Sequence, residues 1–318
     1  MTMAALIGLD WGTSSLRAYL FDRAGNVLEA RHRAYGIRSL PDGGFDAALA
    51  EIVREWPRCP RLAAGMVGAR GGWREVPYLD LPAQADAVGA SLHSLIAADG
   101  EPVHLVPGLR NPQRPDVMRG EETQILGALA LEPALDSNAT LAMPGTHSKW
   151  VDLRGGCIVD FQTLMTGELF AVLTVHSILG APLKDGGARG AAHAEAFGRG
   201  VRLAFDSGSA GGFSRLFSIR ASMLSAALPV DDVADTLSGL LIGEEIRAVA
   251  AGGAFDLSAP VHLIGDEALC ARYRQALQAF SIESRMIAQD VAAHGLWRIA
   301  TAAGLAAAGA ASDAGAQS

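Results

Sequence analysis

The chain has 318 residues, with 26 Lys and Arg against 34 Asp and Glu, so its formal net charge is −8. Half of the residues are hydrophobic and 19% are charged, which supplies enough apolar material for buried cores and excludes a disordered chain. The acidic balance argues against a nucleic-acid-binding protein, because that function needs a clustered basic surface. No apolar run reaches the roughly 20 residues that a membrane-spanning helix needs.

Cysteine usage and the first residues bear on the compartment. Cys59, Cys157 and Cys270 lie far apart, and none belongs to a CxxC pair, which is typical of free thiols in a reducing compartment. The N-terminus carries no basic region and reaches Asp10 after a short apolar stretch, unlike a signal peptide. We therefore expect a cytoplasmic protein with no nucleic-acid or membrane partner, and we leave a homodimer open.

The first half of the chain begins with a predicted three-strand meander over residues 6–30, with turns at 12–15 and 23–26. Apolar residues at helical spacing then predict a helix over 45–56. The other elements expected in this half are a strand at 62–67, a helix at 84–98, a strand at 103–106, a loop at 107–115 and a helix at 121–131.

The second half opens with the same pattern. Gly12-Thr13-Ser14-Ser15 and Gly145-Thr146-His147-Ser148 share Gly-Thr-x-Ser at an offset of 133 residues, and each lies in the first turn of a meander. This repeat and the chain length predict two related domains, which we divide into an N-terminal lobe over 1–138 and a C-terminal lobe over 139–318. In the second we expect helices at 167–179, 191–205, 214–227, 233–251 and 267–280, a strand at 261–264, a last helix from about 291 that packs back on the N-terminal lobe, and a frayed tail over 307–318.

The two Gly-Thr turns are candidate phosphate-binding segments. A tight turn between strands presents successive N–H groups, and small residues let the backbone approach an anion. Asp10, at the tip of the preceding strand, could hold Mg²⁺, which commonly takes one or two carboxylates plus phosphate oxygens. Lys149 follows the second turn and could reach a phosphate as a point charge. The alternatives are two ordinary hairpins, an exposed aspartate and a solvated surface lysine.

A second group of candidates lies at predicted helix starts. Glu121 and Glu122 begin a helix, where they either favour the helix dipole or provide a general base for phosphoryl transfer. Arg119 could pair with a substrate carboxylate. Thr166 is suited to cap the next helix with Glu168 in its first turn, which is a sufficient structural explanation.

Other nucleotide and metal motifs are absent from the sequence. There is no Walker A segment and no GxGxxG, so P-loop and Rossmann mechanisms are excluded. The eight histidines form no HxxxH pair or His/Cys cluster, which disfavours a zinc site.

Several strings of residues resemble known kinases. Gly8-Leu9-Asp10-Trp11-Gly12-Thr13-Ser14 is similar to the first phosphate motif of the actin, hexokinase and heat-shock-ATPase superfamily. More specific strings resemble the 2-dehydro-3-deoxygalactonokinase family, and together they extend over about residues 6–275. They are Ala64-Gly65-Met66-Val67-Gly68, Val117 to Gln124 (VMRGEETQ), Met143 to Val151 (MPGTHSKWV), Met165 to Leu169 (MTGEL) and Leu237 to Gly243 (LSGLLIG).

The resemblance implies an α/β protein with the two-lobed actin/hexokinase-like (ribonuclease H-like) fold, each lobe a mixed β-sheet with flanking helices and the ligand cleft between the lobes. It implies transfer of the γ-phosphate of MgATP to the 6-hydroxyl of 2-dehydro-3-deoxy-D-galactonate in galactonate breakdown. Carried over by position, it assigns Gly12, Thr13, Ser14, Gly145 and Thr146 to the ATP phosphates, Asp10 to the metal, Gly265 and Asp266 to adenosine, Trp11, Arg119, Met165, Thr166 and Glu168 to the substrate, and Glu121, Glu122 and Lys149 to catalysis.

Two features depart from the superfamily pattern. The superfamily usually has an aspartate base on a helix before the second phosphate segment, whereas this chain has Glu121 and Glu122 there. The adenosine segment has one glycine followed by two acids, where a pair of small residues is usual. Three alternatives stay open from the sequence: a kinase of another sugar or sugar acid, a non-catalytic nucleotide-gated switch, and a sugar sensor.

Overall fold

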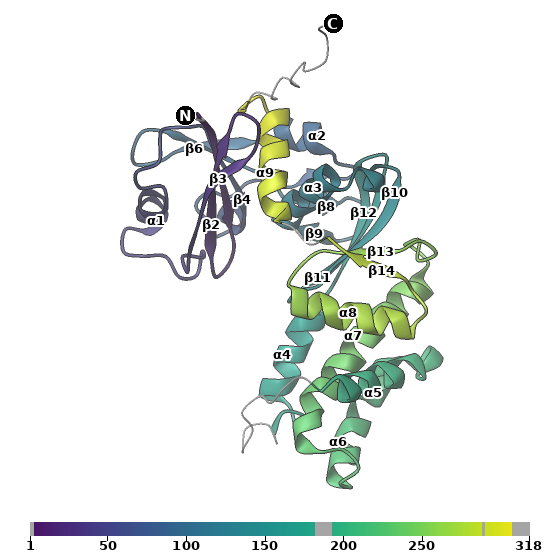
Figure 1. Ribbon diagram of the computed structural model, residues 1–318. Helices are drawn as coiled ribbons and strands as arrows, with labels where there is room; N and C mark the ends of the chain where they lie inside the picture. Colours follow the sequence, from purple (N-terminus) through teal and green to yellow (C-terminus); the bar gives the residue numbers. More distant parts are fainter. Residues whose placement is uncertain (1–2, 182–192, 288–289, 307–318) are drawn as a thin grey trace, which may run out of the picture. The chain divides into compact units, whose positions relative to one another are not determined.

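The computed structural model describes residues 3–181, 193–287 and 290–306 (Figure 1). It divides into two compact units. Unit 1 comprises residues 1–137, 155–159 and 289–318, and unit 2 comprises residues 138–154 and 160–288. The tail expected to fray, 307–318, lies outside the described residues.

Unit 1 is built on a six-stranded mixed sheet. Its first three strands form an antiparallel meander, and β1, β4 and β7 run parallel to one another. The strand order is β3 (Val27–Arg33), β2 (Leu16–Asp22), β1 (Ala4–Trp11), β4 (Arg61–Gly65), β7 (Pro102–Leu105) and β6 (His93–Ile96), and a second sheet holds β5 (Leu79–Asp80), β8 (Leu109–Asn111) and β9 (Asp116–Met118).

The two faces of β1 have different neighbours. Leu9 and Trp11 belong to a core that includes Leu49 and Ile52 of helix α1 (Gly44–Ile52). Because side chains alternate along a strand, Gly8 lies on the other face. A Cβ atom there would come within 3.1 Å of a Leu296 methyl carbon in helix α9 (Val291–Ala302). Glycine therefore allows α9 to pack closely on this face.

Helix α9 also crosses helix α3 (Glu121–Leu131) at close range (Figure 1). A Cβ atom at Gly127 would lie 1.8 Å from the Val291 carbonyl oxygen, and one at Gly295 would lie 1.8 Å from the Thr123 carbonyl oxygen. Any larger residue at either position would force the helix backbones apart. The remaining helical segments of unit 1 are α2 (Ala85–Ala90), η1 (Met66–Gly68) and η2 (Pro133–Asp136).

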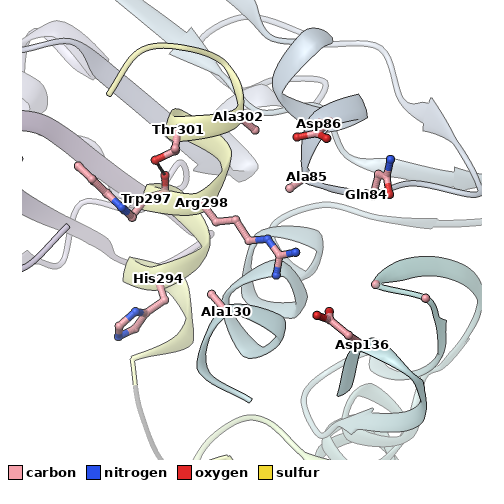
Figure 2. Close-up of a pocket in the computed structure, with 12 residues that line it drawn as sticks. Gln84, Ala85, Asp86, Ala130, Asp136, His294, Trp297, Arg298, Thr301 and Ala302 are labelled. Carbon is pink, nitrogen blue, oxygen red and sulfur yellow. Dashed lines mark hydrogen bonds between the residues drawn. The ribbon is translucent and has the colours of Figure 1, made fainter. Parts of the chain in front are cut away.

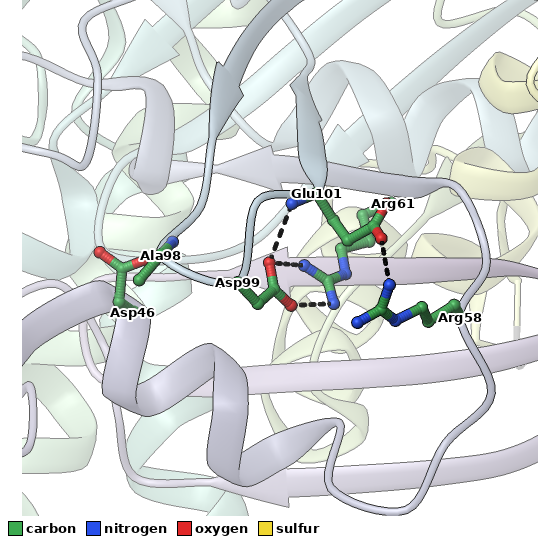
Figure 3. Close-up of polar contacts among 6 residues, drawn as sticks. All are labelled: Asp46, Arg58, Arg61, Ala98, Asp99 and Glu101. Atoms are coloured by element: carbon green, nitrogen blue, oxygen red, sulfur yellow. Dashed lines mark hydrogen bonds and ion pairs between the residues drawn. The ribbon is translucent and has the colours of Figure 1, made fainter.

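Polar contacts hold the end of the sheet at which β4 begins (Figure 3). The side chain of Arg61 is buried and donates to both carboxylate oxygens of Asp99 at 3.0 and 2.6 Å. Arg58 pairs with Glu101 at 3.0 Å, and Asp46 of α1 accepts the Ala98 N–H at 2.6 Å. These contacts hold the β6–β7 turn at the end of β4 opposite Gly65.

Unit 2 repeats the sheet order of unit 1. Its strands run in the order β12 (Cys157–Leu164), β11 (Ser148–Arg154), β10 (Asn138–Met143), β13 (Val261–Leu263) and β14 (Ser284–Met286). Thus each unit has a meander followed by parallel strands on the far side of its first strand, with β10, β13 and β14 parallel. This duplicated order agrees with the actin/hexokinase-like fold that the resemblance implied, and the two Gly-Thr turns occupy equivalent hairpins.

Helices make up most of the rest of unit 2. Gly200 and Gly239 let two of them approach closely, since a Cβ atom at either would fall 2.0 Å from a backbone carbonyl oxygen of the other helix. No helix among the described residues is both long and apolar enough to cross a membrane. The helical segments are α4 (Thr166–His176), α5 (Ala194–Phe205), η4 (Gly208–Ala210), η5 (Gly212–Arg215), α6 (Leu216–Leu224), η6 (Val230–Asp232), α7 (Val233–Gly252) and α8 (Glu267–Ala279).

Two predicted elements of unit 1 are wrong. The helix expected over 84–98 ends at Ala90, and residues 93–96 form β6 instead. The reason is tertiary: β6 completes the edge of the sheet beside β7, where Leu95 packs on the core and Ser94 and Ile96 are exposed. The loop expected over 107–115 contains β8.

Candidate active site

The first candidate phosphate turn, residues 12–15, follows β1 and is held by backbone hydrogen bonds. The Gly12 N–H donates to the Ser15 carbonyl at 2.9 Å, and the carbonyls of Gly12 and Thr13 accept from Ile37 and Arg38 at 3.1 and 3.2 Å. Within the described part of the chain, no acceptor occupies the N–H groups of Thr13 or Ser14. The turn therefore offers two successive backbone donors to an anion.

Asp10 lies just before this turn and is half-buried. Burial, above all, raises the pKa of its carboxyl group, the Asp290 charge adds to the rise, and Arg17 opposes it. No side chain or backbone N–H of the described residues donates a hydrogen bond to the carboxylate. A desolvated carboxylate without a donor suits a cation. Because the described residues contain no group of three or more His, Cys, Asp or Glu able to hold a metal, such a cation would depend on phosphate oxygens, as Mg²⁺ commonly does.

Trp11 does not face a ligand surface, contrary to the predicted substrate contact. Its side chain is fully buried, because it points to the face of β1 opposite Asp10. The indole N–H donates to the Tyr35 carbonyl at 2.7 Å, and the ring meets Phe45 and Trp73 edge-on at 5.3 and 5.9 Å. The residue thus supports the strand from the core.

The carboxyl end of β4 meets the start of α3. Gly65 and Gly120 have φ of +92° and +103°, values that favour glycine. A Cβ atom at Gly120 would lie 3.3 Å from the Gly65 Cα atom. The two strings at 64–68 and 117–124, which carried the family resemblance, therefore lie in contact with each other. They are beside the first candidate phosphate turn, because Gly65 pairs with Trp11 across parallel strands.

Arg119 presents unpaired donors at this junction. Its guanidinium lies 4.4 Å over the Tyr78 ring, and Nη2 donates to the Val76 carbonyl at 2.7 Å. Its Nε and Nη1 atoms are buried and have no hydrogen-bond partner in the described structure. Gly68 borders them, with an ideal Cβ position 2.9 Å from Nη1. Buried donors of a charged group are costly to leave unpaired, so an anionic ligand would fit here.

The two adjacent glutamates have different environments. Glu122 is completely buried and accepts from the Gly120 N–H at 2.6 Å, and its other oxygen bonds Thr123 Oγ1 at 3.0 Å. Burial, with a smaller effect of the Glu121 charge, raises the pKa of Glu122 to about 8. Glu121 is partly exposed, and its carboxylate accepts the Arg119 N–H at 3.0 Å. Only Glu121 therefore has surface with which to touch a substrate hydroxyl.

In unit 2 the second phosphate turn is joined to the start of α4. The Glu168 N–H donates to the Thr146 carbonyl at 3.0 Å, and a Cβ atom at Gly167 would lie 2.5 Å from the Gly145 carbonyl oxygen. His147 Nε2 lies 2.5 Å from a Glu168 carboxylate oxygen. Neither the Gly145 nor the Thr146 N–H has an acceptor among the described residues, so this turn also leaves donors free for an anion.

Lys149 is not the solvated surface lysine of the alternative interpretation. Its side chain is 4% exposed within β11, and Nζ donates to the His147 carbonyl at 3.0 Å. The ammonium group is thus bound to the phosphate turn itself, which gives it a role in holding the turn's backbone.

Glu245 in α7 was not predicted from the sequence. Its buried carboxylate accepts from Ser148 Oγ at 2.7 Å, Trp150 Nε1 at 2.8 Å and Tyr273 Oη at 2.9 Å, and also from Thr166 Oγ1. Burial raises its pKa, and these hydrogen bonds act against the rise. The carboxylate links β11, α4 and α8 behind the second phosphate turn. Its place just after the apolar run 240–243, within the helix expected over 233–251, was the sequence signal for it.

The adenosine candidates lie at the carboxyl end of β13. Gly265 has a φ of +151°, and its ideal Cβ position is 3.3 Å from the Pro144 carbonyl oxygen, directly before the second phosphate turn. Asp266 accepts the Leu269 N–H at 3.0 Å as the N-cap of α8, which accounts for its carboxylate structurally. Met165 is half exposed at the start of α4.

A separate cavity of about 740 Å³ lies in unit 1 between α2, α3 and α9 (Figure 2). The Arg298 side chain extends into it from α9, and His294 and Asp136 lie at its border. None of the residues predicted to bind ATP, metal or substrate lines this cavity. We therefore assign it no part in the reaction.

Comparison with known proteins identifies the family. Residues 10–299 match the family model for 2-keto-3-deoxy-galactonokinase. The chain belongs to this family. The 2-dehydro-3-deoxygalactonokinase of Escherichia coli (strain K12) is 37% identical over 296 residues, covering 91% of this chain and 94% of that protein. A Rhizobium meliloti (strain 1021) protein named a probable 2-dehydro-3-deoxygalactonokinase is 36% identical over 297 residues, covering 89% and 92%.

A solved structure supports the same family. The crystal structure of a Sinorhizobium meliloti protein described as a 2-dehydro-3-deoxygalactonokinase has a TM-score of 0.81 and 34% identity, and the match covers 93% of this chain and 98% of that one. The chain is thus a sugar-acid kinase of this family, as the sequence strings indicated.

Proposed function

We propose that this kinase transfers the γ-phosphoryl group of ATP to the 6-hydroxyl of 2-dehydro-3-deoxy-D-galactonate. The product is 2-dehydro-3-deoxy-6-phospho-D-galactonate, an intermediate of galactonate breakdown, and the reaction takes place in the cytoplasm. The family match over 10–299 and the two named relatives support this substrate. The Arg119 side chain is the structural observation that favours a sugar acid over a neutral sugar as the substrate. Its buried Nε and Nη1 donors lack partners among the described residues.

ATP would be bound through its phosphates. The free N–H groups of Thr13 and Ser14 in unit 1, and of Gly145 and Thr146 in unit 2, are suited to phosphate oxygens. Asp10 would hold Mg²⁺, which neutralises charge on the transferred group. Gly265 and Asp266 are proposed to border adenosine.

Glu121 is proposed as the general base that takes the proton of the 6-hydroxyl. It is the exposed member of the pair, and the Arg119 N–H orients its carboxylate. Glu122 acts as a positioning residue, since it fixes the Gly120 N–H at the start of the helix. Met165 and Glu168 are proposed substrate contacts, and Thr166 is positioned by Glu245.

The experiment compares the keto acid with its uncharged methyl ester in wild type and in Arg119→Gln. We expect wild type to prefer the acid, and the variant to lose about 10- to 100-fold of that preference, the range for hydrogen bonds to a charged group, with KM for ATP unchanged. Arg110→Gln is the matched control, because Arg110 pairs with Asp80 at the surface of unit 1. A preference retained in Arg119→Gln would contradict the assignment, and turnover of neutral sugars instead would replace the substrate.

A further inference from the structure

The second sheet of unit 1 brings Tyr78 and Arg119 to the same place. Tyr78 directly precedes β5, and Arg119 directly follows β9. Both strands pair with β8, β5 in parallel and β9 antiparallel. Continuing the two registers by one residue puts Gly108, which precedes β8, between Tyr78 and Arg119. Because cross-strand neighbours share a face of the sheet, the two side chains lie on the same side of Gly108.

Gly108 leaves room for these two side chains to meet. A Cβ atom at this position would lie 2.8 Å from Cε1 of Tyr78, so the tyrosine ring covers the glycine. The Arg119 guanidinium lies over the ring, 4.4 Å from its centroid. The negative face of an aromatic ring attracts a guanidinium, whose planar shape suits it to stacking. A side chain at residue 108 would displace the ring from the place where it supports Arg119.

The segment before β5 holds Arg119 at a second point. The Val76 carbonyl accepts from Arg119 Nη2 at 2.7 Å, and the Val76 N–H donates to the Gly68 carbonyl at 3.0 Å. Tyr78 and Val76 therefore fix the face and one nitrogen of the guanidinium. Its buried Nε and Nη1 atoms have no hydrogen-bond partner among the described residues. The group is thus held by contacts that leave two of its nitrogen atoms for a ligand.

We propose that Tyr78 is a positioning residue for substrate recognition, whose ring holds the Arg119 guanidinium in the orientation that binds the substrate carboxylate. The inference rests on the proposed function, because it takes Arg119 as the group that binds the acid. An arginine side chain fixed before the substrate arrives loses less entropy on binding than a mobile one. The ring performs this role, since no hydrogen bond among the described residues involves the Tyr78 hydroxyl group.

The test compares the keto acid with its uncharged methyl ester in full-length wild type, Tyr78→Phe and Tyr78→Leu. Tyr78 is 39% exposed, so both variants should fold, which circular dichroism checks. We expect Tyr78→Leu to lose about 3- to 30-fold of the preference for the acid, the range that a cation–π contact supplies. The loss should lie in KM for the acid, with kcat and KM for ATP near their wild-type values. Tyr78→Phe keeps the ring and should keep the preference.

Two further variants complete the experiment. Trp56→Leu is the matched control, because Arg31 lies 4.4 Å from the centroid of the Trp56 ring elsewhere in unit 1, and it should leave the preference unchanged. In the double variant, Tyr78→Leu should add no further loss to that of Arg119→Gln, because the group that the ring positions is already gone. An additional loss of the same factor would show that Tyr78 acts independently of Arg119 and would overturn the inference.

The remaining outcomes distinguish this inference from the function on which it rests. A full preference for the acid in Tyr78→Leu, together with its loss in Arg119→Gln, would overturn the role of Tyr78 and leave Arg119 as the carboxylate-binding residue. An equal loss in Tyr78→Phe and Tyr78→Leu would assign the effect to the hydroxyl group and contradict the role of the ring. A lower melting temperature in Tyr78→Leu with an unchanged preference would reduce the contact to a structural one. A preference retained in Arg119→Gln would remove the carboxylate assignment itself, and the role of Tyr78 with it.

Discussion

Replacing each of the two adjacent glutamates with glutamine should separate catalysis from stability. Glu121→Gln removes the proposed base and should lower turnover about a hundredfold or more, with a small effect on the free energy of unfolding because Glu121 is partly exposed. Glu122→Gln should keep turnover within about tenfold of wild type, since the neutral amide still has an oxygen to accept the Gly120 N–H.

The pKa of Glu122 gives the size of the expected change in the free energy of unfolding. Burial raises that pKa from 4.5 to about 8 in the folded protein. Between these values the folded state keeps a proton that the unfolded state releases, so the free energy of unfolding falls as pH rises from about 4.5 to 8 and is level above. At 1.36 kcal/mol per pKa unit, the full change is about 5 kcal/mol. Glu122→Gln has no group to ionise and should lack this slope.

The assay is urea unfolding of wild type and both variants between pH 5 and 9, paired with steady-state kinetics. Wild type and Glu121→Gln should lose stability toward pH 8, whereas Glu122→Gln should gain relative to wild type by several kcal/mol over the same range. A difference in free energy of unfolding between wild type and Glu122→Gln that does not vary with pH would contradict a raised pKa of Glu122. If Glu122→Gln lost most of its turnover while Glu121→Gln kept nearly all of it, the roles of the two glutamates would be exchanged.

Three further variants, one of them with a matched control, test the residues around the candidate site. Gly120→Ala, at a φ of +103° and against Gly65, should lower the free energy of unfolding by about 1–3 kcal/mol, and Gly71→Ala, with positive φ but open space around it, should cost less in the same urea titration. Glu245→Leu removes the acceptor that four buried donors share and should lower the free energy of unfolding by about 3 kcal/mol or more. A free energy of unfolding close to that of wild type would show the network to be unimportant. Asp10→Asn should raise the Mg²⁺ concentration that gives half-maximal turnover while circular dichroism stays unchanged, and an unaltered Mg²⁺ dependence would remove Asp10 from the metal site.

Local patterns predict the elements that carry the candidate site. Glycine and threonine between short strands indicated both candidate phosphate turns, which lie between paired strands in the structure. The helix expected at 121–131 has those bounds. The RGEE string at residues 119–122 indicated the start of a helix, because acidic residues are favoured at that position. These features depend on residues close together in the chain, which is why a single sequence reveals them.

The parts that the sequence did not reveal depend on packing between distant segments. Residues 93–96 become a strand only because β7 offers an edge to pair with. Trp11 and Asp10 are neighbours in sequence, yet the pleat sends one into the core and the other to the face of α9. The structural role of Glu245 depends on hydrogen bonds from Ser148 and Trp150, almost one hundred residues earlier in the chain.

The central claim is that this chain phosphorylates a specific sugar acid. ADP release by wild-type protein with MgATP should be measured for 2-dehydro-3-deoxy-D-galactonate, its gluconate epimer, galactonate, glucose and glycerol, and the product characterised by phosphorus NMR. We expect turnover with the first compound well above the others and a phosphate on C6. Turnover confined to another member of the panel, or none at all from a folded protein that binds ATP, would contradict phosphorylation of this sugar acid.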